Sequence, residues 1–353
     1  MHVRAIVAAI FVVVAALVVA TTASTNTSQA LPNLKGTTLT VVNFGGNLAE
    51  AQRKAWQIPF AKATGAKVRD DLVDYAKLKA QVQSGNVTWD VVEADTFFVQ
   101  QQCGKLFLPR DKSIVKSTRN ALPGSISNRC GVPVVASATV LAYNPAKYGN
   151  TPPKTWNDFF NTAKFPGKRA VWNYVLNGLP EAALLASGVS PKKLYPLNMD
   201  RAFTKLETIK DDLLFADTLA QQQEQVTSGQ ADMAMIFTGR LLGAVREGSK
   251  FKAVWTQNLR IWDNMAIARG SKQVNAGMHY LEYLLNPAVQ NRLTRYSPYT
   301  SMLKGPRPKT DPLTAKYLTN DPKHYKLGLD IDQIWWSKNY DEMAERWTAF
   351  TSG

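Results

Sequence analysis

Aromatic side chains stand next to acidic, basic or small polar residues at the ends of several expected strands. The groups are Phe44 with Gly45 and Gly46, Asp95 with Phe97, Trp172 with Asn173, Phe237 with Thr238 and Arg240, and Trp262 with Asp263. Aromatic faces attract organic cations, and a carboxylate adds a directional charged hydrogen bond. Their recurrence at strand ends predicts a binding pocket with aromatic walls and a few fixed charges.

Asp263 interrupts an apolar strand pattern, IWDNMAIA, at residues 261–268. A carboxylate in such a strand is costly unless a cation or a hydrogen-bond donor meets it. Its partner is either a group on a ligand or an internal arginine such as Arg240 or Arg260.

Enzymatic signatures are absent from the sequence. We find no nucleophile elbow, HExxH, Walker loop or GxGxxG. His279 and His324 stand beside no serine, cysteine or metal-ligand pattern. We therefore expect no catalytic residues, no metal and no cofactor; a secreted hydrolase or the ligand-binding module of a sensor is the alternative from another class.

The composition is that of a soluble globular protein with a basic surface. The chain has 353 residues, 45% hydrophobic and 20% charged, with a net charge of +15. Lysines and arginines are scattered singly, without an arginine-rich stripe carrying interleaved aromatics. A solvated basic surface is therefore expected in preference to a nucleic-acid interface.

The first thirty residues have the pattern of an export signal. His2 and Arg4 precede an uninterrupted apolar run, Ala5 to Ala20, and a small polar stretch follows. Ser28 and Ala30 suit the positions before a cleavage site. We expect residues 1–30 to be a cleaved signal peptide and the mature protein to be soluble and exported; an uncleaved membrane anchor is the alternative.

Cys103 and Cys130 are the only cysteines. Export to an oxidising compartment favours a disulfide between them. A reactive thiol or a metal site is the competing interpretation, and the lack of a nearby histidine argues against zinc.

Hydrophobic periodicity predicts an α/β protein. Strands and helices alternate over residues 38–95, which is typical of a parallel sheet with covering helices. Residues 131–145 read as two strands with a hinge between them. Later segments predict further strands together with helices at 180–188, 199–213 and 275–296. We therefore expect two α/β lobes that the chain crosses more than once.

The ordered series of these segments resembles a known family. VVNFGGNLAEAQRKAWQIPFAKATGAKV, GNVTWDVVEAD, CGVPVVASATVLAYNP, SGQADMAMIFTGRL and WWSKNYDEMAERWTAF occur in the order and spacing found in periplasmic solute-binding proteins of ABC importers. The resemblance is to the spermidine/putrescine-binding-like group, which includes binders of 4-aminobutyrate and other small amines. It implies a two-lobed periplasmic-binding-protein fold, type II-like, with a ligand cleft between lobes joined by crossing strands.

The resemblance also implies roles for single residues. Asp263 matches the acid that meets a ligand amine, Asp95 stands at a polar contact, and Phe97 matches an aromatic cleft residue. Phe44 and Phe237 stand where polyamine binders usually carry tryptophan. Gly45-Gly46 departs from the polyamine pattern and, with Arg240, is similar to members that take amino acids.

We therefore expect a non-enzymatic receptor for a small amine or ω-amino acid such as 4-aminobutyrate, with a linear polyamine as the alternative. Asp263 and Asp95 would hold an amine, while Arg240 and the glycine pair would hold a carboxylate. The partners are a small-molecule ligand and a membrane permease, with no nucleic acid, and the protein is expected to be a monomer. One lobe is expected to comprise residues 31–138 and 264–302, the other residues 139–263 and 303–353.

Overall fold

One β-sheet runs through the part of the chain that the computed structural model describes, residues 31–122, 124–125, 129–305 and 309–352. Its strands are β1 Thr38–Asn43, β2 Lys67–Leu72, β3 Val91–Asp95, β4 Val132–Tyr143, β5 Arg169–Trp172, β6 Leu213–Ala216, β7 Met233–Phe237, β8 Lys252–Ile267 and β9 Leu329–Asp330. Their order is β2-β1-β3-β8-β4-β7-β5-β6, and β9 pairs with β8. The predicted α/β class is confirmed.

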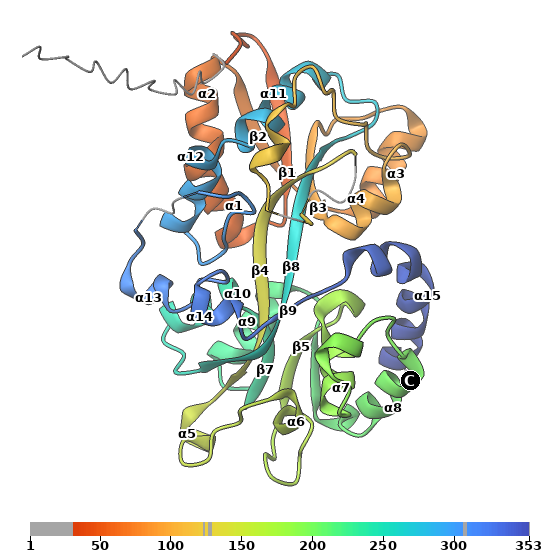
Figure 1. The fold of residues 1–353 in the computed structure, drawn as a ribbon, viewed down its shortest axis with the longest axis vertical. Coiled ribbons are helices and arrows are strands. Elements are labelled where there is room, and N and C mark those ends of the chain that lie inside the picture. The colour runs from red at the N-terminus through yellow and green to blue at the C-terminus, as the bar shows by residue number, and fades with distance from the viewer. Residues whose placement is uncertain (1–30, 123, 126–128, 306–308, 353) are drawn as a thin grey trace, which may run out of the picture. The chain divides into compact units, whose positions relative to one another are not determined.

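Two long antiparallel strands, β4 and β8, connect the two halves of the sheet (Figure 1). On one side, β8 pairs with β3, which continues into the parallel set β3-β1-β2. On the other side, β4 pairs with β7, which continues into the parallel set β7-β5-β6. The two parallel sets are the sheets of the two lobes, and β4 and β8 are the strands that cross between them.

Helices cover both halves of the sheet. The regular helices are α1 Gly46–Gln52, α2 Ile58–Thr64, α3 Tyr75–Ser84, α4 Thr96–Gln102, α5 Pro145–Tyr148, α6 Trp156–Phe159, α7 Leu179–Ala186, α8 Met199–Glu207, α9 Leu219–Thr227, α10 Thr238–Arg246, α11 Val274–Leu284, α12 Pro287–Gln290, α13 Pro312–Ala315, α14 Pro322–Tyr325 and α15 Gln333–Ser352. A π-helical segment, Arg53–Gln57, joins α1 to α2. Gly65 and Gly85 end α2 and α3 in the left-handed conformation, as the sequence predicts.

Three predicted elements differ from the structure. Residues 132–143 form one strand rather than two with a hinge, and register shifts at Pro133/Val135 and Thr139/Leu141 provide the irregularity. The helix expected over 199–213 ends at Glu207, because a short 3₁₀ turn leads directly into β6. The helix expected over 275–296 breaks at Pro287, whose ring prevents continuation of the preceding turn.

The C-terminal helix α15 contacts elements of both lobes. The Gln101 amide of α4 donates to Asp341 at 3.1 Å, while the Trp336 indole donates to Glu181 of α7 at 2.9 Å. The buried Trp336 joins the apolar core formed with α4, α7 and α8. This helix therefore connects the two lobes outside the crossing strands.

The predicted disulfide is confirmed. Cys103 follows α4 and Cys130 precedes β4, with their Cα atoms 5.6 Å apart. The predicted signal peptide, residues 1–30, lies outside the described residues. Within the described residues, no helix has the length and apolar character needed to cross a bilayer.

Candidate ligand-binding site

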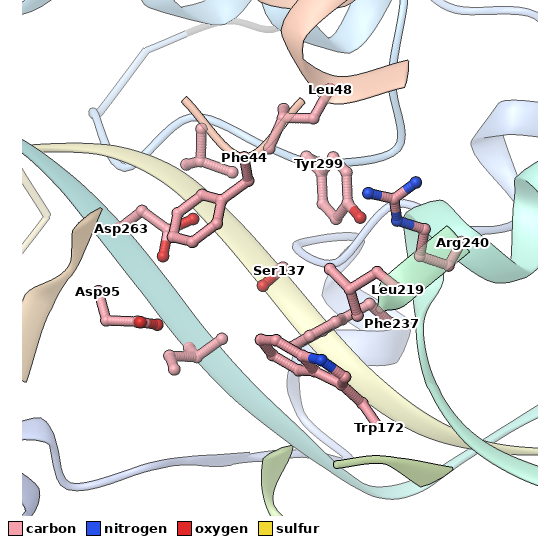
Figure 2. Close-up of a pocket in the computed structure, with 12 residues that line it drawn as sticks. Phe44, Leu48, Asp95, Ser137, Trp172, Leu219, Phe237, Arg240, Asp263 and Tyr299 are labelled. Atoms are coloured by element: carbon pink, nitrogen blue, oxygen red, sulfur yellow. The ribbon is translucent and has the colours of Figure 1, made fainter. Parts of the chain in front are cut away.

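A cavity opens beside the two crossing strands, where the ends of several other elements meet (Figure 2). It contains about 500 Å³ of empty volume, part of which is open to solvent. Its lining residues are Phe44, Leu48, Asp95, Val135, Ser137, Trp172, Leu219, Phe237, Arg240, Ile261, Asp263 and Tyr299. They come from both lobes and from β4 and β8 between them, so a small solute in this cavity would contact both lobes.

Two carboxyl groups form the acidic side of the cavity. Asp95 ends β3 and lies directly opposite Asp263 of β8 in the antiparallel register. Asp95 Oδ2 accepts hydrogen bonds from the hydroxyls of Tyr75 at 2.7 Å and Tyr174 at 3.1 Å. Asp263 is only 8% exposed, yet its side chain makes no hydrogen bond or ion pair with a described residue. Asp263 therefore presents an unpaired acid to the cavity.

The environment raises the pKa of both aspartates. For Asp95, burial is the main cause, and the two tyrosine hydroxyls partly oppose it. For Asp263, burial raises the pKa well above its ordinary value, and the neighbouring acids Glu93 and Asp95 raise it further. A ligand cation would reverse this effect, because it stabilises the charged form of a carboxyl group.

Arg240, from α10, supplies the cation of the cavity. Figure 2 shows it on the side away from Asp95 and Asp263. It forms no ion pair with a described residue, and it lies beside Tyr299. Burial raises the pKa of Tyr299 to about 12, although the charge of Arg240 acts in the opposite direction. Arg240 is therefore available to a ligand anion.

Asp263 does not form the internal salt bridge that the sequence left open. Arg260 pairs instead with Asp330, with 2.7 Å between Nε and Oδ1, and its guanidinium stacks over the ring of Tyr325 at 4.0 Å. Arg240 lies across the cavity from Asp263 (Figure 2). A ligand group remains as the partner that Asp263 could meet.

Aromatic rings form the walls between the two charged sides. Phe44, Trp172, Phe237 and Tyr299 all line the cavity. Trp172 and Phe237 meet nearly edge to face, with ring centroids 6.1 Å apart. Such walls exclude water, which strengthens charged contacts to a ligand.

Half of the residues singled out in the sequence line the cavity: Phe44, Asp95, Trp172, Phe237, Arg240 and Asp263. Of the others, Phe97 is fully buried and packs on Tyr340, with ring centroids 4.5 Å apart. Thr238 is fully buried near Thr319, and Asn173 bonds to Asp217 and Trp347. Strand alternation places Trp262 on the face opposite Asp263.

The glycine pair lies next to the lining residues without lining the cavity. The Gly45 amide donates to Asn43 Oδ1 at 3.0 Å. Gly46 has a φ of 62°, and a β-carbon there would lie 2.9 Å from Arg240 Nη1. The absence of a side chain at Gly46 leaves the space that the Arg240 guanidinium occupies.

Six lining residues were missed from the sequence: Leu48, Val135, Ser137, Leu219, Ile261 and Tyr299. A signal existed for Ile261 alone, since residues two apart on a strand share a face and Asp263 was already predicted. Ile261 accompanies Asp263 on β8, whereas Val135 accompanies Ser137 on β4, which was itself missed. Tyr299 lies in an irregular segment with no periodicity to mark it.

Comparison with known proteins shows the family. The family of bacterial extracellular solute-binding proteins matches residues 55–323. The chain belongs to this family. The predicted family is thereby confirmed, and the solved structures described next confirm the two-lobed binding-protein fold.

Individual relatives cover nearly the whole chain. A gamma-aminobutyric acid-binding protein of Pseudomonas aeruginosa is 29% identical over 322 residues, covering 89% of this chain and 91% of the relative. A solved structure described as a GABA receptor is 33% identical, with a TM-score of 0.79, covering 89% of this chain and 97% of that one. A periplasmic binding protein from A. tumefaciens R10, in complex with agropinic acid, is 31% identical, with a TM-score of 0.80, covering 90% and 99%.

Within the described residues, no group of three His, Cys, Asp or Glu side chains is placed to hold a metal ion. The acidic side of the cavity carries the two carboxyl groups of Asp95 and Asp263. Its geometry suits an organic cation, which needs a carboxylate and an aromatic surface rather than a closed set of oxygen ligands.

Proposed function

We propose that this protein is a periplasmic receptor for an ω-amino acid of the 4-aminobutyrate type, which it delivers to an ABC permease. Asp263 and Asp95 would bind the ammonium group, and Arg240 would bind the carboxylate. One observation carries the proposal: unpaired groups of opposite charge lie on opposite sides of one aromatic-walled cavity. A zwitterion with its charges at its two ends complements this arrangement.

The relatives support a ligand that carries an acid group. Two of them are named for gamma-aminobutyric acid, and a third was solved with agropinic acid. Gly46 supports the role of Arg240, because it leaves the guanidinium room beside the turn that precedes α1. The contact to a ligand carboxylate would come from Arg240, with the glycine pair providing space.

Calorimetry of the Arg240→Gln variant tests the proposal. Loss of a buried charged hydrogen bond costs about 2–5 kcal/mol, so affinity for 4-aminobutyrate should fall roughly thirtyfold or more. Arg246→Gln is the matched control, because Arg246 lies on the same helix and already pairs with Asp311 at 3.4 Å. Equal affinity of wild type and Arg240→Gln for 4-aminobutyrate would show that Arg240 does not bind a ligand carboxylate.

A linear polyamine is the second candidate, and the pair of acids Asp95 and Asp263 favours it. In that case Arg240 repels the ligand. Putrescine should then bind the wild-type protein more tightly than 4-aminobutyrate does, and Arg240→Gln should strengthen its binding. The opposite ranking of the two ligands supports the ω-amino acid.

Delivery to a permease requires export and a soluble mature form. We propose that the chain is cleaved near Ala30, acts as a monomer in the periplasm and catalyses no reaction. We place the lobe boundaries at 138/139 within β4, at 263/264 within β8 and at 302/303. Mass spectrometry of the exported protein should find its first residue near Leu31; an intact, membrane-retained Met1 would contradict cleavage.

A further inference from the structure

Three buried carboxyl groups occupy neighbouring positions on β3 and β8. Glu93 and Asp95 are two residues apart on β3 and therefore face the same side of the strand. Asp263 is the cross-strand partner of Asp95, and side chains directly opposite in an antiparallel pair have β-carbons about 5 Å apart. Glu93 is fully buried and does not line the cavity, so it lies behind the two aspartates, away from the ligand space.

No cation in the described residues pairs with this acidic cluster, defined as Glu93, Asp95 and Asp263. The Gln52 amide of α1 donates to both oxygens of Glu93, at 2.8 and 2.9 Å. Tyrosine hydroxyls bond to Asp95, and the Asp263 side chain has no partner among the described residues. The titratable and charged groups facing the cluster are Tyr75 from α3, Tyr174 after β5, Tyr280 from α11, Tyr299, Tyr340 from α15, and Arg240 beside Tyr299.

Three like charges in such a space repel one another, and burial adds to the cost of ionising each of them. Burial raises the pKa of Glu93 to about 8, the Gln52 amide lowers it in part, and the charge of Asp95 adds to the increase. The pKa of Asp263 is also raised, first by burial and then by the charges of Glu93 and Asp95. Buried carboxyl groups that interact electrostatically at close range titrate together and share protons in this way.

We propose that the acidic cluster holds a proton in the ligand-free protein at neutral pH and releases it when the ligand ammonium binds, and that Glu93 sets how firmly this proton is held. The inference rests on the proposed function in placing an ammonium group against the aspartates. The step balances as one cluster carboxylic acid plus one ligand ammonium giving a carboxylate–ammonium pair and one proton passed to the buffer. Glu93 does not touch the ligand. It is a positioning residue that acts through its charge on Asp95 and Asp263.

Affinity then depends on pH in a defined direction. The binding-competent cluster is the one that has lost its proton, and its population increases with pH. Release of one proton per ligand makes the affinity for 4-aminobutyrate increase by up to about tenfold per pH unit through the neutral range. The increase stops once the empty cluster has already lost that proton.

Calorimetry in buffers of different ionisation enthalpy counts the released protons. At pH 7, 4-aminobutyrate binding to the wild-type protein in phosphate and in Tris should show release of about one proton per ligand. Glu93→Gln should release less than half of that, since the repulsion that holds the proton is gone. Gln52→Leu should move the pH midpoint upward, because it removes the donor that stabilises ionised Glu93.

A matched control is available in the second lobe. Glu181 is another fully buried carboxyl group, with hydrogen bonds from Tyr195 at 2.7 Å and Trp336 at 2.9 Å. Glu181→Gln should leave proton release unchanged. Equal proton release by wild type and Glu93→Gln would overturn the role of Glu93.

Infrared spectroscopy of the ligand-free protein tests the held proton without any ligand. The wild type at pH 7 should show a protonated-carboxyl band that Glu93→Gln weakens and that fades between pH 7 and 9. An unchanged band in Glu93→Gln would overturn the inference. If 4-aminobutyrate fails to bind while the band behaves as expected, the proposed function fails separately, and putrescine becomes the probe for release.

Discussion

Asp263 is buried and has no partner in the described part of the chain, and that combination makes its ionised form costly in the empty protein. An isolated buried carboxylate is unfavourable, whereas the same group paired with a ligand ammonium is satisfied. We expect Asp263→Asn to lower affinity for 4-aminobutyrate roughly thirtyfold or more, because the bound ammonium loses its charged partner. The melting temperature of the ligand-free variant should equal or exceed that of wild type.

Calorimetry and melting curves of the same Asp263→Asn preparation check both halves of this prediction. A variant that binds as tightly as wild type would show that Asp263 is not the ammonium partner. A large loss of stability without ligand would instead indicate an internal partner for its charge.

The same residue predicts how stability depends on pH. Folding raises the pKa of Glu93 and Asp263 above their ordinary values of 4.5 and 3.8, so the native state binds more protons than the unfolded state. The stabilising contribution is present at low pH and is lost as pH rises toward about 8, the pKa of Glu93. The contribution of this cluster to stability should therefore decrease between pH 5 and pH 8, and the melting temperature of the ligand-free wild type should fall with it.

Asp263→Asn should make that fall smaller, because it removes one of the repelling charges. Thermal unfolding across the pH range, compared between the two proteins, measures the difference. Parallel curves would show that the cluster is already fully ionised at pH 5.

The sequence predicted the charged residues of the cavity better than its neutral walls. Asp263 and Arg240 were found because a charge beside an aromatic residue is unusual in a buried strand or at its end. Ser137 carries no such mark, and Ile261 is marked only by its place two residues from Asp263; the strand pairing shows which face of β4 and β8 meets the cavity. Trp262 was assigned to the site because the sequence alone does not show which side of β8 faces the cavity.

At the scale of elements, the first residue of α1 leaves room for a cation that comes from the other lobe. Gly46→Ala would place a β-carbon 2.9 Å from Arg240 Nη1, at a φ of 62°. We expect a loss of about tenfold in affinity for 4-aminobutyrate as the guanidinium moves, and a loss of about 1–2 kcal/mol in stability from the left-handed backbone.

Gly85→Ala separates these two effects. Gly85 ends α3 with a φ of 72°, and a β-carbon there meets no atom within 4 Å. It should lose similar stability and keep its affinity, as measured by calorimetry beside melting curves. Equal affinities in the two variants would show that Gly46 does not position Arg240.

The elements also show what local patterns could and could not specify. Residues 38–95 were assigned correctly because each helical stretch ends on a glycine and each strand is short; β1 and β3 are apolar, whereas β2, KVRDDL, is mostly charged and exposed. Residues 131–145 were divided into two strands because a strand that belongs to both lobes has two registers, and sequence alone reads a register shift as an interruption. The lobe that each segment joins depends on strand pairing, which no local pattern contains.

At the scale of the whole molecule, a hydrogen bond between the two lobes links a ligand-binding residue of the cavity to the position of one lobe against the other. The Tyr174 hydroxyl, from the segment after β5, donates to Asp95 at the end of β3. Tyr75 donates to the same carboxyl oxygen from within the first lobe. Asp95 therefore contributes both to the ligand cavity and to the contact that holds the lobes together.

Because ligand and lobe contact share Asp95, binding should favour the closed arrangement of the lobes. Small-angle X-ray scattering with saturating 4-aminobutyrate should give a smaller radius of gyration than the ligand-free protein. Tyr174→Phe removes one hydrogen bond between lobes, worth about 0.5–1.5 kcal/mol, so affinity should fall about two- to tenfold. Tyr148→Phe, which removes a hydroxyl bonded to the Pro166 carbonyl within one lobe, should leave affinity unchanged. Identical scattering profiles with and without a tightly bound ligand would mean that recognition occurs without closure, and the permease would then have to distinguish loaded from empty receptor by the ligand itself.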